Sequence, residues 1–256
     1  MDKVPIDAVG TSVHVLNALR ERPQAVTELA TRLDRPKATI YYHLKTLENF
    51  EYVVQRDGKY ELGLRLLELG GSVGARHQII DVVAPNVKRL VSEAHETGFF
   101  AVMASDAAVV IEIERPSDIA EQVDLALGTY LPLHCSATGK AILTALSDET
   151  RHEIFERITL DSYTEDTITD ESALATHLEH TRSEGHVFDM GERSEHIRAV
   201  ASPATTSDGY VIGALGIIGT SQRLYDDRFT HELPHLLNTY VERMKHEFQS
   251  SSSKPR

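Results

Sequence analysis

Apolar residues near the N-terminus recur with the spacing of one helix face. Ile40, Leu44 and Leu47 stand at i, i+4 and i+7 and predict an amphipathic helix. Pro36 suits the first helical position, where a missing N–H has no consequence. The pattern ends near Asn49. The sequence therefore predicts one exposed helix of about three turns, with a single apolar stripe packed on a core.

A change from helical spacing to short extended runs follows directly. Residues 52–56 and 59–62 flank Asp57-Gly58, a dipeptide typical of two-residue β-hairpin turns. Arg56 and Lys59 stand on either side of the tip. The segment is therefore predicted to be a β-hairpin with a positively charged end.

Two further helices are predicted before this pair of elements. Residues 11–21 have helical apolar spacing, and Thr27 is the expected N-cap of a short second helix. Asp34-Arg35 is expected to form a tight turn into the third helix. Helix, short helix, turn, helix and hairpin form a winged helix-turn-helix, placed at residues 1–66.

The polar arc of the third helix carries hydroxyls, an amide and a cation but no carboxylate. This composition suits a helix that lies against phosphates and base edges. The alternative is a surface helix and hairpin in another α/β domain. The expected DNA contacts, from helix and hairpin together, are Lys37, Thr39, Tyr41, Tyr42, Lys45, Arg56 and Lys59.

The remainder of the chain alternates between helical and extended patterns. A leucine-rich segment at 63–75 predicts a linker helix, assigned to 67–76, that frays at Gly70-Gly71 and is either a core helix or a dimer seam. The second domain is expected to begin near His77 with a long amphipathic helix, whose apolar face runs from Ile80 to Ala94 and which bends at Pro85 and stops at Gly98. Strands are expected at 99–103, 109–114, 123–127, 187–190, 199–205 and 210–219, with helices at 139–146, 148–158, 171–184 and 226–248. These elements predict an α+β domain at 77–248, followed by a disordered tail at 249–256.

Charge is distributed unevenly along the 256 residues. The net charge is −13, yet residues 1–66 carry ten Lys/Arg against nine Asp/Glu, so the acidity lies outside the predicted DNA-binding part. Arginine outnumbers lysine by 18 to 8. An acidic, lysine-poor surface is typical of cytoplasmic proteins of salt-loving archaea, and the composition therefore suggests such a source for this chain.

Several classes of protein are disfavoured by composition. The single cysteine, Cys135, excludes an intrachain disulfide and an all-cysteine metal site. No apolar run approaches the roughly 20 residues of a membrane helix, and no basic-then-apolar signal peptide is present. We therefore expect a cytoplasmic protein without a membrane partner, a metal site or a cofactor.

Five stretches of the sequence occur in a recognisable order and spacing. In the first 66 residues they are ELATRLDRPKATIYYHLKTLE and RDGKYELG, and after them LPLHCSATGKAIL, EGHVFDMGE and AVASPATTSDGYVIGALGIIG. Through these stretches the chain resembles the IclR family of transcriptional regulators over almost its whole length. This resemblance implies a winged helix joined by a linker helix to a GAF-like effector domain. It also implies dimers or dimers of dimers that bind palindromic operator DNA and respond to small metabolites, often carboxylates, sugar acids or aromatic acids.

The chain departs from the family pattern at several positions. Tyr42 replaces a usual arginine of the recognition helix, and a turn glycine is missing at 49–51. Ala199, Gly216 and Ile218 stand where cysteine and serine are frequent, which leaves fewer donors and more room.

The effector site is expected around residues 134–138, just before a helix, because free N–H groups at a helix start attract anions. The resemblance places effector contacts at the positions of Ala137 and Thr138, and a ligand-binding carboxylate at Asp189. Asp189 is otherwise a turn-capping aspartate. The predicted effector is a small hydroxylated acid, such as a sugar acid, in preference to a dicarboxylate. The full predicted set of effector-binding residues is His134, Ser136, Ala137, Thr138, Asp189, Ala199, Gly216 and Ile218.

Enzymatic and redox functions are the alternatives. A dyad of Cys135 and His134 is disfavoured because neighbours on a strand point to opposite faces, so a buried structural thiol is expected. Lys140 lacks the surrounding pattern of a phosphate-binding loop, and His177 and His180 are interpreted as surface residues. The leading hypothesis is a ligand-responsive regulator that is not an enzyme; the alternatives are a hydrolase or a redox-sensing domain fused to a winged helix.

Overall fold

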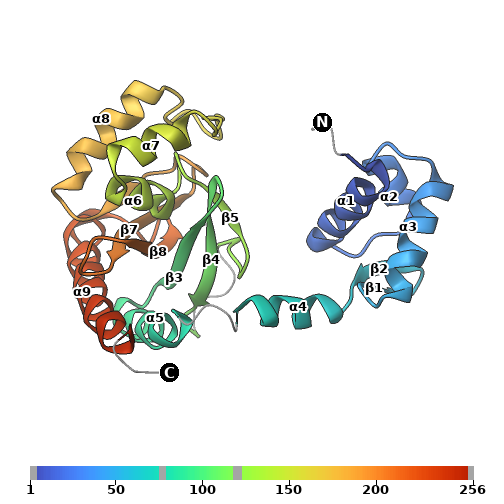
Figure 1. The fold of residues 1–256 in the computed structure, drawn as a ribbon, viewed down its shortest axis with the longest axis horizontal. Helices are drawn as coiled ribbons and strands as arrows, with labels where there is room; N and C mark the ends of the chain where they lie inside the picture. Colours follow the sequence, from blue (N-terminus) through green and yellow to red (C-terminus); the bar gives the residue numbers. More distant parts are fainter. Residues whose placement is uncertain (1–4, 75–78, 118–122, 253–256) are drawn as a thin grey trace. The chain divides into compact units, whose positions relative to one another are not determined.

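A computed structural model describes residues 5–74, 79–117 and 123–252 (Figure 1). The chain divides into two compact units, Met1–His77 and Gln78–Arg256. The predicted end of the linker helix at 75–76, the predicted start of the second domain near His77 and the last four residues of the predicted tail lie outside the described residues.

The first unit has the predicted three helices and hairpin. Their bounds are α1 Asp7–Glu21, α2 Val26–Arg32, α3 Lys37–Asn49, β1 Val53–Arg56 and β2 Lys59–Leu62. The core joins all five, with Val15, Leu29 and Ile40 fully buried. Asp57 and Gly58 both have positive φ, at 48° and 77°, as a type I′ hairpin turn requires. The winged helix-turn-helix prediction is confirmed in these elements.

Three details of the first unit differ from the predictions. α1 starts at Asp7 rather than at residue 11. α2 is capped at Ala25 rather than at Thr27, because the Glu28 carboxylate accepts a hydrogen bond from the Ala25 N–H at 2.7 Å. Pro36 occupies the N-cap of α3 and not its first turn.

The helix α4, Arg65–Gly74, belongs to the first unit and has no buried residue. It continues through Gly70 and Gly71, so the predicted fraying at these glycines is wrong. Leu67 and Val73 are 73% and 60% exposed, and Leu64 just before the helix is 84% exposed. Within its own unit α4 is therefore not a core helix.

The second unit is built on a six-stranded sheet in the order β5-β4-β3-β8-β7-β6, with every neighbouring pair antiparallel. Its strands are β3 Thr97–Ala104, β4 Ala107–Glu114, β5 Tyr130–Pro132, β6 Val187–Asp189, β7 Ile197–Thr205 and β8 Val211–Thr220. The α+β fold class is confirmed.

Helices cover both faces of this sheet (Figure 1). On one face lie α5 Ile80–Ala94, the short π-helix η1 Arg228–Glu232 and α9 Leu233–Ser252; on the other lie α6 Ala137–Ala145, α7 Asp148–Phe155 and α8 Glu171–Arg182. Because side chains alternate along a strand, Phe100 and Leu215 belong to the core with α5 and α9, while Phe99 and Ala214 belong to the core with α6. The sheet therefore separates two cores.

Three predicted element boundaries or elements in the second unit are wrong. Residues 123–127 do not form a strand, although Val123 and Leu125 are buried, and β4 instead pairs with β5 at 130–132. α5 ends at Ala94, because its C-cap His95 has a φ of 51° that breaks the helix, and Gly98 lies inside β3. Residues 249–252 continue α9, so the predicted disorder does not begin at 249. Among the described helices, none is long and apolar enough to cross a membrane.

Candidate functional site

The predicted DNA-binding face is solvent-accessible on both of its elements. Ile40, Leu44 and Leu47 are the buried residues of α3, which leaves its polar arc outside the core. Tyr41 and Tyr42 are 44% and 70% exposed. Thr39 is half-buried, and Lys37, Arg56 and Lys59 are exposed. This face therefore has the accessibility that a nucleic-acid contact requires.

Two of its four cations are held by carboxylates that the predicted set did not include. Lys45 Nζ lies 2.7 Å from Glu48 Oε2 on the same helix, and Arg56 Nε lies 2.9 Å from Glu61 Oε1 across the hairpin. In the described part of the chain, Lys37 and Lys59 have no ion pair within 4.0 Å. The face thus presents one paired and one unpaired cation on each element.

The loop before α6 is tied down by its own polar groups. Ser136 Oγ donates to the Pro132 carbonyl at 2.6 Å and accepts from the Gly139 N–H at 3.2 Å. His134 Nε2 lies 3.0 Å from the Asp161 carbonyl oxygen. Ser136 therefore acts as the N-cap of α6, and a ligand would have to replace one of its two hydrogen bonds to reach its hydroxyl.

Three of the four strand residues of the predicted effector set lie in one row beneath α6, and Gly216 lies two positions before Ile218 on β8. Asp189 pairs with Ala199 across β6 and β7, and Ala199 pairs with Ile218 across β7 and β8. Ala137 packs in the same core as Ala199 and Ile218. The fold thus brings together segments that are about 80 residues apart in the chain.

The expected room beside Gly216 is not present in this structure. A Cβ atom at Gly216 would meet Phe99 Cε1 at 2.8 Å and Thr138 Cγ2 at 3.0 Å. Thr138 is completely buried, and Ala199 and Ile218 are 3% exposed. Glycine is needed here because the ring of Phe99 takes the volume that a side chain would fill, so the prediction of extra space was wrong.

Asp189 caps the turn that follows β6. Its Oδ1 accepts hydrogen bonds from the backbone N–H groups of Gly191 at 3.1 Å and Glu192 at 2.8 Å. Burial raises the pKa of this carboxyl, while nearby Lys140 and the backbone donors oppose the rise. The turn-capping role is therefore present, whether or not the carboxylate also meets a ligand.

A buried ion pair beside Asp189 was missed by the sequence analysis. Lys140 Nζ, fully buried in α6, donates to Glu192 Oε1. Burial raises the pKa of Glu192 to about 7, although Lys140 lowers it. Glu192 Oε2 and Thr138 Oγ1 are buried and have no hydrogen-bond partner among the described residues. The sequence signal that could have indicated this buried pair is the single lysine within the apolar run of α6.

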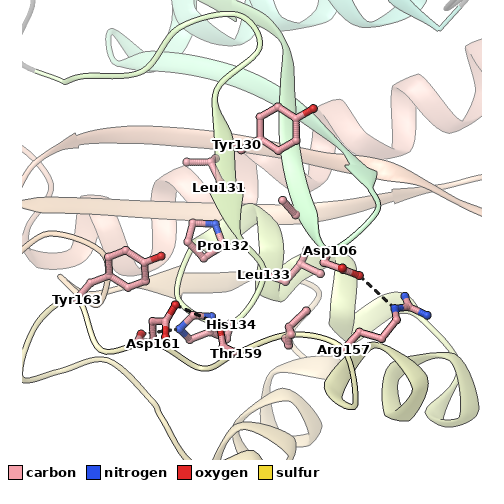
Figure 2. Close-up of a pocket in the computed structure, with 12 residues that line it drawn as sticks. Asp106, Tyr130, Leu131, Pro132, Leu133, His134, Arg157, Thr159, Asp161 and Tyr163 are labelled. Atoms are coloured by element: carbon pink, nitrogen blue, oxygen red, sulfur yellow. Dashed lines mark hydrogen bonds and ion pairs between the residues drawn. The ribbon is translucent and has the colours of Figure 1, made fainter. Parts of the chain in front are cut away.

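A surface pocket of about 360 Å³ opens beside the loop before α6 (Figure 2). Tyr130, Tyr163 and His134 line it, and an ion pair between Asp106 and Arg157 closes one side. Of the eight predicted effector residues, the lining contains His134. The pocket therefore adjoins the predicted site through the loop before α6 and is not the site itself.

The cysteine and histidine predictions have different outcomes. Cys135 is fully buried, and burial raises its pKa to about 12, as expected for a structural thiol. His177 is not a solvated surface residue: it is half-buried, its Nε2 is buried with no hydrogen-bond partner in the part of the chain that the structure describes, and desolvation lowers its pKa. His180 is exposed. In the described ranges, no group of three or more His, Cys, Asp or Glu side chains is placed to hold a metal ion.

Two family descriptions match this chain. "Bacterial transcriptional regulator IclR C-terminal" matches residues 72–245, and "IclR helix-turn-helix domain" matches residues 9–57. The HTH-type transcriptional repressor AllR of Escherichia coli strain K12 is 30% identical over 211 residues, which are 81% of this chain and 77% of that protein. The AllR of Klebsiella pneumoniae is 29% identical over 210 residues, covering 81% and 77%.

Solved structures show the same fold over most of both chains. The IclR of Thermotoga maritima has a TM-score of 0.76 at 22% identity and covers 94% of this chain and 98% of its own. An IclR homolog of Microbacterium hydrocarbonoxydans, solved with 4-hydroxybenzoate, has a TM-score of 0.75 at 22% identity and covers 95% and 99%. The chain belongs to the IclR family of transcriptional regulators, as its sequence motifs indicated.

Proposed function

We propose that this regulator binds a palindromic operator in the cytoplasm as a dimer or a dimer of dimers. In this mode α3 enters the major groove, and the hairpin contacts the sugar-phosphate backbone beside it. The exposure of the α3 polar arc and of the cations at the hairpin tip supports the proposal. One helix-turn-helix reads only a few base pairs, so two half-sites are needed for specificity.

Two unpartnered apolar surfaces of the first unit support the dimer. On α4 and just before it, Leu64, Leu67 and Val73 are exposed. At the start of α1, Ile6, Val9 and Val13 line a groove and are 63%, 58% and 48% exposed. Apolar side chains exposed together on one helix are typical of a protein–protein contact. Light scattering of the intact chain should give at least a dimer, Leu67→Asp should weaken it, and a monomer both free and on DNA would refute this part.

The proposed DNA face is tested by single substitutions. Lys59→Ala should weaken binding to all duplexes alike and reduce the salt slope of the affinity by roughly one unit, because one phosphate contact is lost. Tyr42→Ala should change which operator is preferred, because Tyr42 stands where base edges and methyl groups are read. If the single alanine variants of Thr39, Tyr42, Lys45 and Lys59 all bind DNA with unchanged affinity, this face is not the DNA-binding face.

The effector is proposed to be a small acid that also carries hydroxyl groups, with a sugar acid as the first choice. The observation that carries this proposal is that Thr138 Oγ1 and Glu192 Oε2, both close to α6, are buried and have no hydrogen-bond partner among the described residues. Buried polar atoms are almost always satisfied, so a bound molecule that supplies hydrogen bonds to these two atoms would be stabilised here. Lys140 is the buried cation that would meet the acid, and Glu192 would accept from a hydroxyl.

A second class of effector is favoured by one relative. The Microbacterium homolog was solved with 4-hydroxybenzoate, which also combines one carboxylate with a hydroxyl. An aromatic acid would require Phe99 to move from its contact beside Gly216. Sugar acids should therefore bind with less rearrangement than aromatic acids.

Thermal stability in the presence of candidate acids tests this proposal. A ligand at a hundred times its dissociation constant adds about 2.7 kcal/mol to stability, so sugar acids, dicarboxylates and aromatic acids including 4-hydroxybenzoate can be ranked. Asp189→Asn keeps an oxygen that can cap the turn, whereas Asp189→Ala removes the cap as well as the charge. Asp189 is proposed to accept from a further hydroxyl through a carboxylate oxygen that Asp189→Asn replaces with an amide nitrogen, which cannot accept. This variant should therefore abolish the response to a hydroxylated acid and leave operator binding intact. A parent-like response in both variants would mean that Asp189 is only a turn cap.

A further inference from the structure

The predicted DNA face carries two carboxylates that neutralise half of its positive charge in the free protein. Glu48 holds Lys45 at 2.7 Å on α3, and Glu61 holds Arg56 at 2.9 Å on the hairpin. Both carboxylates are half-buried, so their side chains are restrained where they stand. Lys45 also lies 5.9 Å from the centre of the Tyr41 ring, within cation–π range. Lys45 is therefore drawn toward its own helix.

The other cation on each element is not held in this way. Lys37 at the start of α3 and Lys59 at the hairpin have no carboxylate within 4.0 Å among the described residues. Lys59 acts on Glu28 only at longer range, as a minor contribution to the lowered pKa of that group. On α3 and on the hairpin, a cation held by a carboxylate can therefore be compared with one that is not.

We propose that Glu48 and Glu61 restrain Lys45 and Arg56 and so lower the affinity of this regulator for DNA of arbitrary sequence. The inference rests on the DNA face proposed above. A cation that contacts a phosphate must first leave its carboxylate, and that carboxylate then lies near the phosphate and repels it. Lys37 and Lys59 bear no such cost, so they supply most of the sequence-independent attraction.

The physical argument fixes the size and the salt dependence of the effect. Exposed ion pairs of this kind contribute little, so replacing one carboxylate should tighten binding about two- to fivefold at low salt. The gain should shrink as salt rises, because the ion pair in the parent protein is itself screened. A larger gain would indicate rearrangement of the face rather than release of one cation.

Binding of the intact chain to a random-sequence duplex tests the proposal, with fluorescence anisotropy followed as KCl is raised. Glu48→Gln and Glu61→Gln should each bind more tightly than the parent protein. Glu21→Gln is the matched control, because it removes one carboxylate from an ion pair with Arg32, a residue outside the proposed DNA face. It reports how much affinity changes with net charge alone.

A double-mutant comparison separates release of the cation from general electrostatics. The gain from Glu48→Gln should disappear when Lys45 is already alanine, and the gain from Glu61→Gln should disappear when Arg56 is alanine. Lys37→Ala and Lys59→Ala should each cost more affinity than Lys45→Ala and Arg56→Ala.

The outcomes distinguish this inference from the proposed function. If the parent chain binds the duplex and Lys59→Ala weakens it, but Glu48→Gln and Glu61→Gln equal Glu21→Gln, the inference is overturned and the DNA face stands. If their gains persist in the alanine backgrounds, the carboxylates act only through net charge, and the inference is again overturned. If Lys59→Ala and Lys37→Ala leave binding unchanged, the proposed face itself fails.

Discussion

The buried ion pair between Lys140 and Glu192 allows a prediction whose magnitude follows from the structure. The perturbation is Lys140→Met, which keeps the length of the side chain in the core around α6 but removes its charge. Lys140 is fully buried and Glu192 is 6% exposed, so water cannot replace the lost partner without rearrangement. Removing one partner of a buried pair costs about 3–5 kcal/mol, because the other charge is left uncompensated. In a domain of this size that loss lowers the melting temperature by roughly 6–20 °C.

The pH dependence of this loss has a definite sign. Burial raises the pKa of Glu192 from 4.5 to about 7, so the folded protein binds more protons than the unfolded chain within that window, and stability falls as pH rises through it. Lys140 lowers this pKa, and its removal therefore extends the window to higher pH. Lys140→Met should accordingly lose more stability at about pH 8 than at about pH 5.5, where the carboxyl is neutral in the folded state.

Scanning calorimetry of the intact chain is the suitable assay, because the chain has no tryptophan to report on unfolding and calorimetry follows the heat of unfolding of both units. The double variant Lys140→Met with Glu192→Gln removes both charges and should recover most of the loss. Lys45→Met breaks an exposed pair instead, and should cost about 1 kcal/mol or less in the other unit.

Two results would refute the reasoning. A loss for Lys140→Met as small as that for Lys45→Met would show that the buried pair contributes no more than an exposed one. An equal loss at both pH values would show that Glu192 does not change its protonation state within this range.

Three further predictions concern packing, the thiol and salt. Gly216→Ala should destabilise the second unit by about 1–3 kcal/mol in a urea titration, because the new Cβ would lie 2.8 Å from Phe99 Cε1. Cys135 should not react with a thiol reagent in the native protein and should react fully in denaturant, because burial raises its pKa to about 12; rapid native reaction would revive the redox-sensing alternative. If the surface is adapted to high salt, the melting temperature should rise steadily between about 0.1 and 2 M KCl, because salt screens the excess of acidic groups.

Local patterns were sufficient to predict the first unit. The spacing of Ile40, Leu44 and Leu47 identified the buried face of α3, and Asp57-Gly58 identified the hairpin turn. Both features depend on residues at most seven positions apart, so the sequence displays them directly. The predicted cap at Thr27 was wrong because the N-cap is Ala25, which has no hydroxyl to cap the helix. The carboxylate of Glu28, three positions later, accepts the hydrogen bond from the Ala25 N–H instead.

Long-range packing explains most of what was missed in the second unit. Lys140 and Glu192 are 52 positions apart, and nothing in either local pattern indicates that α6 will lie against the turn after β6. The space expected at Gly216 is filled by Phe99 from a neighbouring strand. The segment 123–127 has the composition of a strand, but β4 is paired at that edge by residues 130–132 instead. Partner choice in a sheet is a tertiary property that propensity does not determine.

The number of available cations links the DNA face to the oligomeric state. In the proposed mode each protomer offers Lys37 and Lys59 freely, whereas Lys45 and Arg56 must first leave their carboxylates. Affinity for a duplex falls with salt in proportion to the number of phosphates contacted, so two to four contacts from one protomer give weak binding at physiological salt. A dimer doubles that number and gains it only when both winged helices meet the groove together. An effector that binds one arrangement of the dimer better would change the spacing of its two winged helices. Even a small change would then remove half of the phosphate contacts at once. On this argument, weak binding by each protomer would make operator binding in the proposed mode sensitive to a metabolite held in the other domain.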